Sequence, residues 1–240
     1  MGKTIIQQAR GHGSLSYQAK KRAFVFEIKY PKKLNGKIVV LNIINSRAHS
    51  APLAKMKMKY TNAEGKNEEK MFYTPACNGL IVGQEINGSE VKDGDIRALK
   101  DVPVGKFIFN LESRPGDGGK MIRTAGSVGQ LVGRTENGMM DILMPSKKRK
   151  LMHEDCKVTL GTIANAGRLE KPIIKAGKMH YIKKSRNKLW PRTSAVKFNA
   201  IDHPFGSGRG KRIKSKIAYK NAPAGRKVGI LRPRRTGKQK

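Results

Sequence analysis

The segment KIVVLNIINSRAHSAPLAKMKMKY, residues 37–60, decides the fold class. Residues 37–44 form a nearly continuous apolar run, which is typical of a largely buried strand. Residues 55–60 alternate lysine with methionine, as a strand does when one side faces a core. We therefore expect Met56 and Met58 to face the core. The lysines beside them would face water or phosphate, and the sequence leaves these two alternatives open.

Turn signals recur at short intervals around this segment, from Asn35-Gly36 to Asn137-Gly138. No stretch between residues 38 and 165 keeps apolar residues at helical spacing for long. This pattern predicts an all-β architecture of small barrels, which leave few strand edges exposed, with a break near residues 87–95. The further strand candidates are residues 71–73, 80–86, 106–111, 128–134, 139–144 and 156–163.

The basic charge is distributed unevenly along the chain. The chain has 51 Lys and Arg against 17 Asp and Glu, so its formal net charge is +34, and a polyanion must neutralise it. The net charge is +8 over residues 1–37, +5 over residues 38–165 and +21 over residues 166–240. We therefore expect the middle to be globular and both flanks to be extended basic arms, because the C-terminal flank cannot bury enough apolar area to offset its chain entropy. The predicted division is residues 1–37, 38–89, 90–165 and 166–240.

Other features narrow the compartment and the kind of partner. No apolar run approaches the length of a membrane span, and the N-terminal residues lack the order of a secretory signal, so we expect a cytoplasmic protein with no membrane partner. Cys77 and Cys156 stand far apart and predict neither a disulfide framework nor a zinc site. We interpret both as small buried apolar residues.

Ordered motifs in the C-terminal flank identify a family. They are Gly-Arg-Leu-Glu-Lys-Pro at residues 167–172, Trp190-Pro191, and Asn-Ala-Ile-Asp-His-Pro-Phe-Gly-Ser-Gly at residues 199–208. In this order they resemble the C-terminal half of the large-subunit ribosomal protein L-two family, and the resemblance covers nearly the whole chain. The closing Arg-Arg-Thr-Gly at residues 234–237 looks more like archaeal and eukaryotic members. Ala200 and Ser207 depart from the family pattern, which commonly has Pro and Gly there.

The resemblance implies an oligonucleotide-binding-type (OB) barrel followed by an SH3-like barrel, with extended basic N- and C-terminal arms that thread into large-subunit rRNA. It implies a structural constituent of the large ribosomal subunit that supports subunit association and organisation near the peptidyl transferase region. The implied partners are large-subunit rRNA, neighbouring ribosomal proteins and the small subunit at the interface, without a homo-oligomer. No protein-bound cofactor is expected, and any Mg²⁺ nearby would be held by RNA phosphates.

Both flanks supply the candidate RNA contacts, because Lys and Arg neutralise phosphates. Trp190 would either stack on an unpaired base or pack on a barrel. Gly206 and Gly208 would either let backbone approach phosphate or merely provide flexibility. The candidates are Arg10, Lys20, Lys21, Arg22, Arg168, Lys171, Lys175, Arg186, Lys188, Trp190, Arg192, Asn199, Asp202, His203, Gly206, Gly208, Arg226, Lys227, Arg234 and Arg235.

The Asp202-His203 pair suggests acid–base catalysis, but adjacent side chains of an extended chain point to opposite sides. We expect Asp202 to cap the turn at Pro204 and His203 to contact RNA. The other histidines share no metal spacing, and no P-loop is present. The sequence therefore predicts a protein that is not an enzyme. Two alternatives stay open: a DNA- or chromatin-compacting protein with barrel modules, and an RNA-dependent catalytic contributor through His203.

Overall fold

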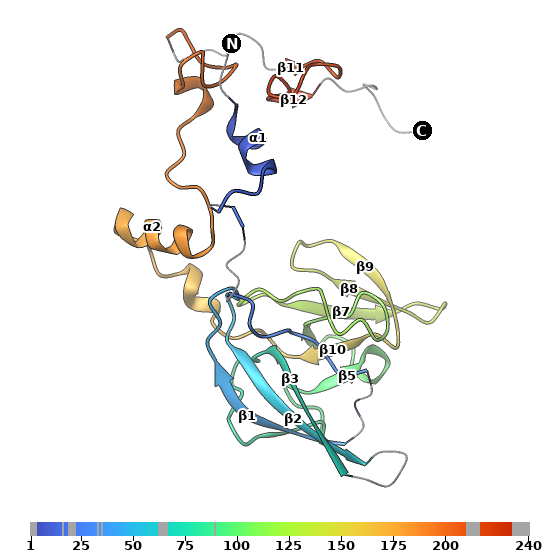
Figure 1. The fold of residues 1–240 in the computed structure, drawn as a ribbon. Coiled ribbons are helices and arrows are strands. Elements are labelled where there is room, and N and C mark those ends of the chain that lie inside the picture. Colours follow the sequence, from blue (N-terminus) through green and yellow to red (C-terminus); the bar gives the residue numbers. More distant parts are fainter. Residues whose placement is uncertain are drawn as a thin grey trace. The chain divides into compact units, whose positions relative to one another are not determined.

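The computed structural model describes residues 4–15, 17–18, 23–32, 34, 36–61, 67–88, 90–209 and 217–231 (Figure 1). Of residues 10, 11, 61, 67 and 231 only the backbone is described. The chain divides into two compact units, which are treated separately below. We call residues 21–172 the sheet unit, and residues 1–20 together with 173–240 the terminal unit.

The first sheet of the sheet unit is antiparallel, with strand order β3-β2-β1-β4. Its strands are β1 (Lys37–Ile44), β2 (Leu53–Thr61), β3 (Asn67–Pro75) and β4 (Glu85–Ile86). Met56 and Met58 of β2 are at most 2% exposed and pack in an apolar cluster with Ile38 and Phe72, as predicted. On the other side of β2, the ammonium group of Lys57 lies 2.6 Å from a carboxylate oxygen of Glu69 on β3. A protein carboxylate therefore neutralises part of the basic face.

The second sheet is also antiparallel, with strand order β5-β10-β6-β7-β8-β9. Its strands are β5 (Ile96–Ala98), β6 (Phe107–Phe109), β7 (Gly129–Arg134), β8 (Met139–Leu143), β9 (Arg149–His153) and β10 (Lys157–Leu160). Short 3-10 helices follow β5 at Leu99–Asp101 and β10 at Ala166–Leu169. Leu131, Met140 and Ile142 are at most 1% exposed and belong to the apolar core of this sheet.

A third apolar cluster combines residues that flank strands of both sheets, such as Ala51 and Cys77, with Phe109 of β6. The Tyr30 and Thr159 hydroxyls, 2.5 Å apart, tie the N-terminal segment of the unit to β10. Cys77 and Cys156 are free and buried, as predicted, and burial raises the pKa of both thiols to about 11. Both cysteines thus act as small core residues.

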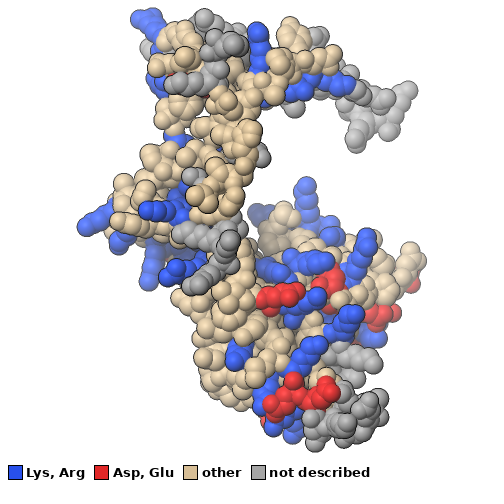
Figure 2. All heavy atoms as spheres, viewed as in Figure 1, with Lys and Arg blue, Asp and Glu red and all other residues tan. Residues whose placement is uncertain are grey.

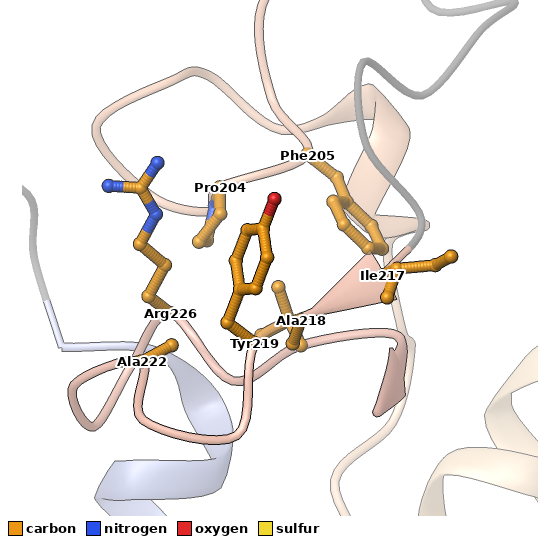
Figure 3. A pocket seen from close by; sticks show the side chains of 8 residues that line it. Pro204, Phe205, Ile217, Ala218, Tyr219, Ala222 and Arg226 are labelled. Atoms are coloured by element: carbon orange, nitrogen blue, oxygen red, sulfur yellow. The ribbon is translucent and has the colours of Figure 1, made fainter. Parts of the chain in front are cut away.

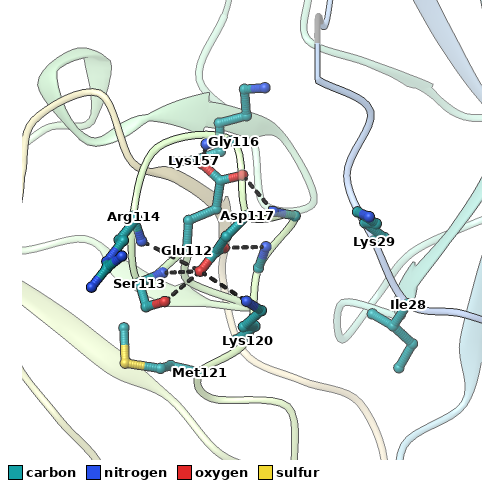
Figure 4. A network of polar contacts seen from close by, with 12 residues as sticks. Ile28, Lys29, Glu112, Ser113, Arg114, Gly116, Asp117, Lys120, Met121 and Lys157 are labelled. Carbon is teal, nitrogen blue, oxygen red and sulfur yellow. Dashed lines mark hydrogen bonds and ion pairs between the residues drawn. The ribbon is translucent and has the colours of Figure 1, made fainter.

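A buried carboxylate organises the loop that follows β6 (Figure 4). Glu112 is fully buried, and its two oxygens accept the backbone N–H groups of Gly116, Gly118 and Lys157 at 2.9–3.1 Å. Asp117 accepts further N–H groups from the same loop, at residues 113, 114 and 119. The carboxylates satisfy donors that the turns leave without strand partners.

The terminal unit contains little regular structure. It holds helices α1 (Ile6–Gly11) and α2 (Ala176–Ser185), a 3-10 helix at Ala195–Lys197, and a short parallel pair of strands, β11 (Ile217–Ala218) and β12 (Ile230–Leu231). None of the ten residues of α2 is buried. The prediction of an extended C-terminal arm did not anticipate this helix.

The all-β prediction is confirmed, since the described core is built of antiparallel sheets that fit barrel-like domains. Two strands of the sheet unit, β5 and β9, were missed, as were β11 and β12 of the terminal unit. The candidate at residues 80–86 contains only the two-residue β4. No helix in the described residues has the length and apolarity to cross a membrane. The four-way division of the chain stays a prediction.

Candidate nucleic-acid interface

The terminal unit is almost free of acidic residues. It has 24 Lys and Arg against Asp202 alone, whereas the sheet unit has 27 against 16 Asp and Glu. On the face drawn in Figure 2, the acidic side chains that show lie over the sheet unit. The terminal unit thus carries +23 of the net charge of +34 with very few internal counterions. Such a surface attracts a polyanion at any physiological ionic strength.

Helix α2 adds basic side chains that the sequence analysis did not single out. Lys183 and Lys184 lie in its last turn, where positive charge also interacts favourably with the helix dipole. Tyr181 is 71% exposed. Its Met179, Ile182 and Lys183 are only half-buried. An isolated helix of ten residues is marginal in water, so a helix with so little buried surface gains stability from another partner. Its signal in the sequence is an acid-free basic segment without amphipathic spacing, at residues 175–188.

The loop at residues 198–208 is shaped by His203. The ring is 8% exposed and lies near Phe198 and Phe205, with ring centroids 6.0 and 5.1 Å away. Its Nδ1 accepts the backbone N–H of Phe205 at 3.0 Å, so the ring proton resides on Nε2. Burial lowers the pKa of His203 below its ordinary value of 6.5, which keeps the ring neutral near pH 7. His203 therefore accepts the N–H group at residue 205, and the cap predicted for Asp202 stays a prediction.

Two neighbouring positions of this loop explain the glycine-rich motif. A Cβ on Gly206 would lie 2.3 Å from the carbonyl oxygen of Asn199, so the close approach that requires glycine is to the chain's own backbone. Ser207 adopts φ +80°, a conformation that glycine reaches without strain. Ser207 thus occupies a glycine-type backbone position, where the family pattern commonly has glycine.

The structure brings most of the predicted contact residues together in the terminal unit. Those that are exposed there are Lys175, Arg186, Lys188, Arg192, Asn199, Gly208, Arg226 and Lys227. Trp190 and Asp202 are half-buried, and part of the Trp190 ring therefore stays accessible for stacking. The two alternatives for Trp190 remain open.

Other predicted residues lie elsewhere. Arg168 and Lys171 belong to the sheet unit, where Arg168 is half-buried and its Nε has no hydrogen-bond partner among the described residues. The predicted contacts at Lys20, Lys21, Arg22, Arg234 and Arg235, and the side chain of Arg10, lie outside the described residues.

The described residues include no group of three His, Cys, Asp or Glu side chains that could hold a metal ion. The geometry is that of an anion-binding surface with accessible aromatic rings, which suits contacts to phosphates and to unpaired bases. Antiparallel sheets combined with such a basic, loop-rich unit are typical of one class of protein, those that bind nucleic acid.

Comparison with known proteins then specifies the family. The family model described as "Ribosomal Proteins L2, C-terminal domain" matches residues 92–225. "Large ribosomal subunit protein uL2" of Archaeoglobus fulgidus is 37% identical over 99% of both chains. The proteins of the same name from Methanococcoides burtonii and Methanothrix thermoacetophila are each 38% identical over the full length of both chains.

The chain belongs to this ribosomal protein family. The resemblance noted in the sequence is confirmed, and so is the expected non-enzymatic role, because the family is a structural component of the ribosome.

Proposed function

We propose that this chain is a structural constituent of the large ribosomal subunit that binds large-subunit rRNA mainly through its terminal unit. The observation that carries the proposal is the ratio of 24 basic residues to one acidic residue in a unit whose helix α2 has no fully buried residue. A protein segment of this kind gains its order from a polyanion. The relatives are named large ribosomal subunit proteins, and we therefore propose the large ribosomal subunit as the particle.

The basic side chains act on RNA by displacing counterions. Each Lys or Arg that meets a phosphate releases condensed cations and lets RNA helices approach one another. The loop around the neutral His203 would present its exposed backbone at Ser207 and Gly208 to RNA. The same residues that the family pattern marks, from Trp190 to Gly208, would support subunit association and organisation near the peptidyl transferase region.

The proposed partners are large-subunit rRNA, neighbouring ribosomal proteins, and the small subunit at the interface, in a cytoplasmic ribosome. The chain is proposed to enter the particle as one copy without a homo-oligomer. Mg²⁺ near the chain would be held by RNA phosphates.

The two alternatives make different use of the same residues. A catalytic His203 would need its ring nitrogens available to substrate, whereas Nδ1 accepts the Phe205 N–H within the loop. A DNA-compacting protein would need only the net charge, and the family of the chain favours the ribosome over it.

Cosedimentation tests whether the chain is part of the large ribosomal subunit. The chain should sediment with large subunits in a sucrose gradient and be released by ribonuclease but not by deoxyribonuclease. Fractionation with chromosomal DNA that resists ribonuclease would support the DNA-compacting alternative and refute the ribosomal one.

The salt dependence of rRNA binding tests whether basic side chains of the terminal unit contact phosphates. Replacing Arg226, Lys227, Arg234 and Arg235 by Ala should weaken binding and lower the slope of log K against log salt by about 0.7–0.9 for each lost phosphate contact. The matched control removes four charges from the sheet unit, at residues 147–150, all exposed. Equal slopes for the wild type and the terminal-unit variant would show that these side chains do not meet phosphate.

A further inference from the structure

The terminal unit contains an apolar pocket of about 470 Å³ (Figure 3). Its walls include Pro204, Phe205, Ile217, Tyr219, Ala222 and Arg226. Ala218 and Val228 complete the lining and are themselves buried, with 5% and 8% exposure. In the view of Figure 3, the Tyr219 ring lies between Arg226 on one side and Phe205 on the other.

Backbone hydrogen bonds hold both loops that form the pocket. On one side, the N–H of Phe205 is bonded to the His203 ring. On the other, the N–H groups of Ala222, Arg226 and Val228 donate to carbonyl oxygens at residues 219, 223 and 226 over 2.9–3.1 Å. The pocket is therefore lined by turns that internal hydrogen bonds hold in shape.

The surroundings of the pocket determine which occupant fits it. Tyr219 is 67% exposed, so much of its side chain can be reached from solvent. Among the described residues, no hydrogen bond or ion pair engages the Arg226 guanidinium. The segment from Ile173 to the C-terminus has 21 Lys and Arg and a single acid, which repels cationic groups and attracts anionic ones.

We propose that this pocket binds one unpaired nucleotide of the rRNA, with its base against Tyr219 and Phe205 and a flanking phosphate at Arg226. The proposal rests on the proposed function, which supplies the RNA. Unpaired bases stack on aromatic rings, and a guanidinium forms bidentate hydrogen bonds with phosphate oxygens. The apolar side chain of a neighbouring protein would fill the same walls but would leave the guanidinium without a phosphate, so we favour the nucleotide.

Equilibrium binding of the full-length chain to a large-subunit rRNA transcript tests the stacking. Tyr219→Ala should weaken binding about 5- to 150-fold, the range of a lost base–aromatic stack, without changing the salt slope. Tyr219→Phe should keep the affinity, because the ring remains. Arg226→Ala should lower the salt slope by about 0.7–0.9. Ile230→Ala is the matched control, because Ile230 is 64% exposed on the adjacent strand and does not line the pocket.

Photocrosslinking of assembled large subunits gives the second measurement. Trypsin releases the tetrapeptide at residues 217–220 from the pocket, and we expect this peptide or the Phe205 peptide to carry a crosslinked nucleotide. Unchanged rRNA affinity of Tyr219→Ala together with crosslinks to a neighbouring protein only would overturn the proposal in favour of a protein side chain. A wild-type chain that binds the transcript no better than duplex DNA would instead refute the proposed function itself.

Discussion

Glu112 should be worth several kilocalories per mole to the sheet unit, and Glu112→Gln tests this. The carboxylate is fully buried and accepts three backbone N–H groups, two at one oxygen and one at the other. Gln keeps one acceptor oxygen, so at least one N–H loses its partner and faces an NH₂ group instead. Hydrogen bonds to charged groups contribute about 1.5–3 kcal/mol, and an unsatisfied buried donor costs about 1–3 kcal/mol. We expect a net loss of about 2–4 kcal/mol.

Urea unfolding of the full-length chain in high salt, followed by circular dichroism, measures this loss. With an m-value of about 2 kcal/mol/M, the midpoint should fall by roughly 1–2 M. The control is Glu90→Gln, because the Glu90 side chain is 76% exposed and pairs only at the surface with Lys92. Its effect should stay within about 0.5 kcal/mol. A Glu112→Gln midpoint indistinguishable from that of the control would refute the argument, and hydrogen exchange at Gly118 locates the loss.

Three further predictions concern single positions. NMR titration of His203 should give a titration midpoint below pH 6.5. Because the unfolded chain then binds the proton at a higher pH than the folded loop does, the loop loses stability as the pH falls from 6.5. A midpoint above pH 6.5 would contradict this. Ser207→Gly should leave the protection of the loop amides unchanged or raise it by up to about 1 kcal/mol, since φ +80° strains serine, whereas a loss above 1 kcal/mol would contradict the strain argument. Leu131→Ala should cost about 2–5 kcal/mol in urea unfolding because the side chain is 0% exposed in the second sheet, and a loss below 1 kcal/mol would mean that the core collapses around the gap.

The alternation of apolar and basic residues predicted the first sheet, because it shows which side chains of β2 face the core. Met56 and Met58 alternate with lysines, and a strand places alternate residues on opposite faces. Strand β9 could not be found in this way, because only Met152 of its five residues is buried. β9 exists because its backbone pairs with β8, where Met140 lies opposite Met152. Such pairing depends on a partner strand and leaves no apolar pattern.

The candidate site was predicted in composition but not in geometry. The excess of Lys and Arg over acids is a property of the sequence, so the basic surface could be located without coordinates. The cap at residue 205 could not be assigned, because Asp202 and His203 are both able to accept an N–H and only the fold of the loop selects between them. Helix α2 was missed for a related reason, since none of its residues is fully buried and its helical spacing of apolar residues is correspondingly weak.

The two buried thiols provide a measure of how the sheet unit opens. With pKa values of about 11, only about one thiol in ten thousand is ionised at pH 7, and neither is exposed to reagent in the closed state. Any labelling by a thiol-specific reagent therefore reports transient opening. Cys77 lies in the cluster that flanks both sheets and Cys156 in the core of the second sheet, so their separate labelling rates distinguish parting of the sheets from unfolding of one of them. The chain carries its own pair of probes for comparing its breathing motions free in solution and inside an assembled particle.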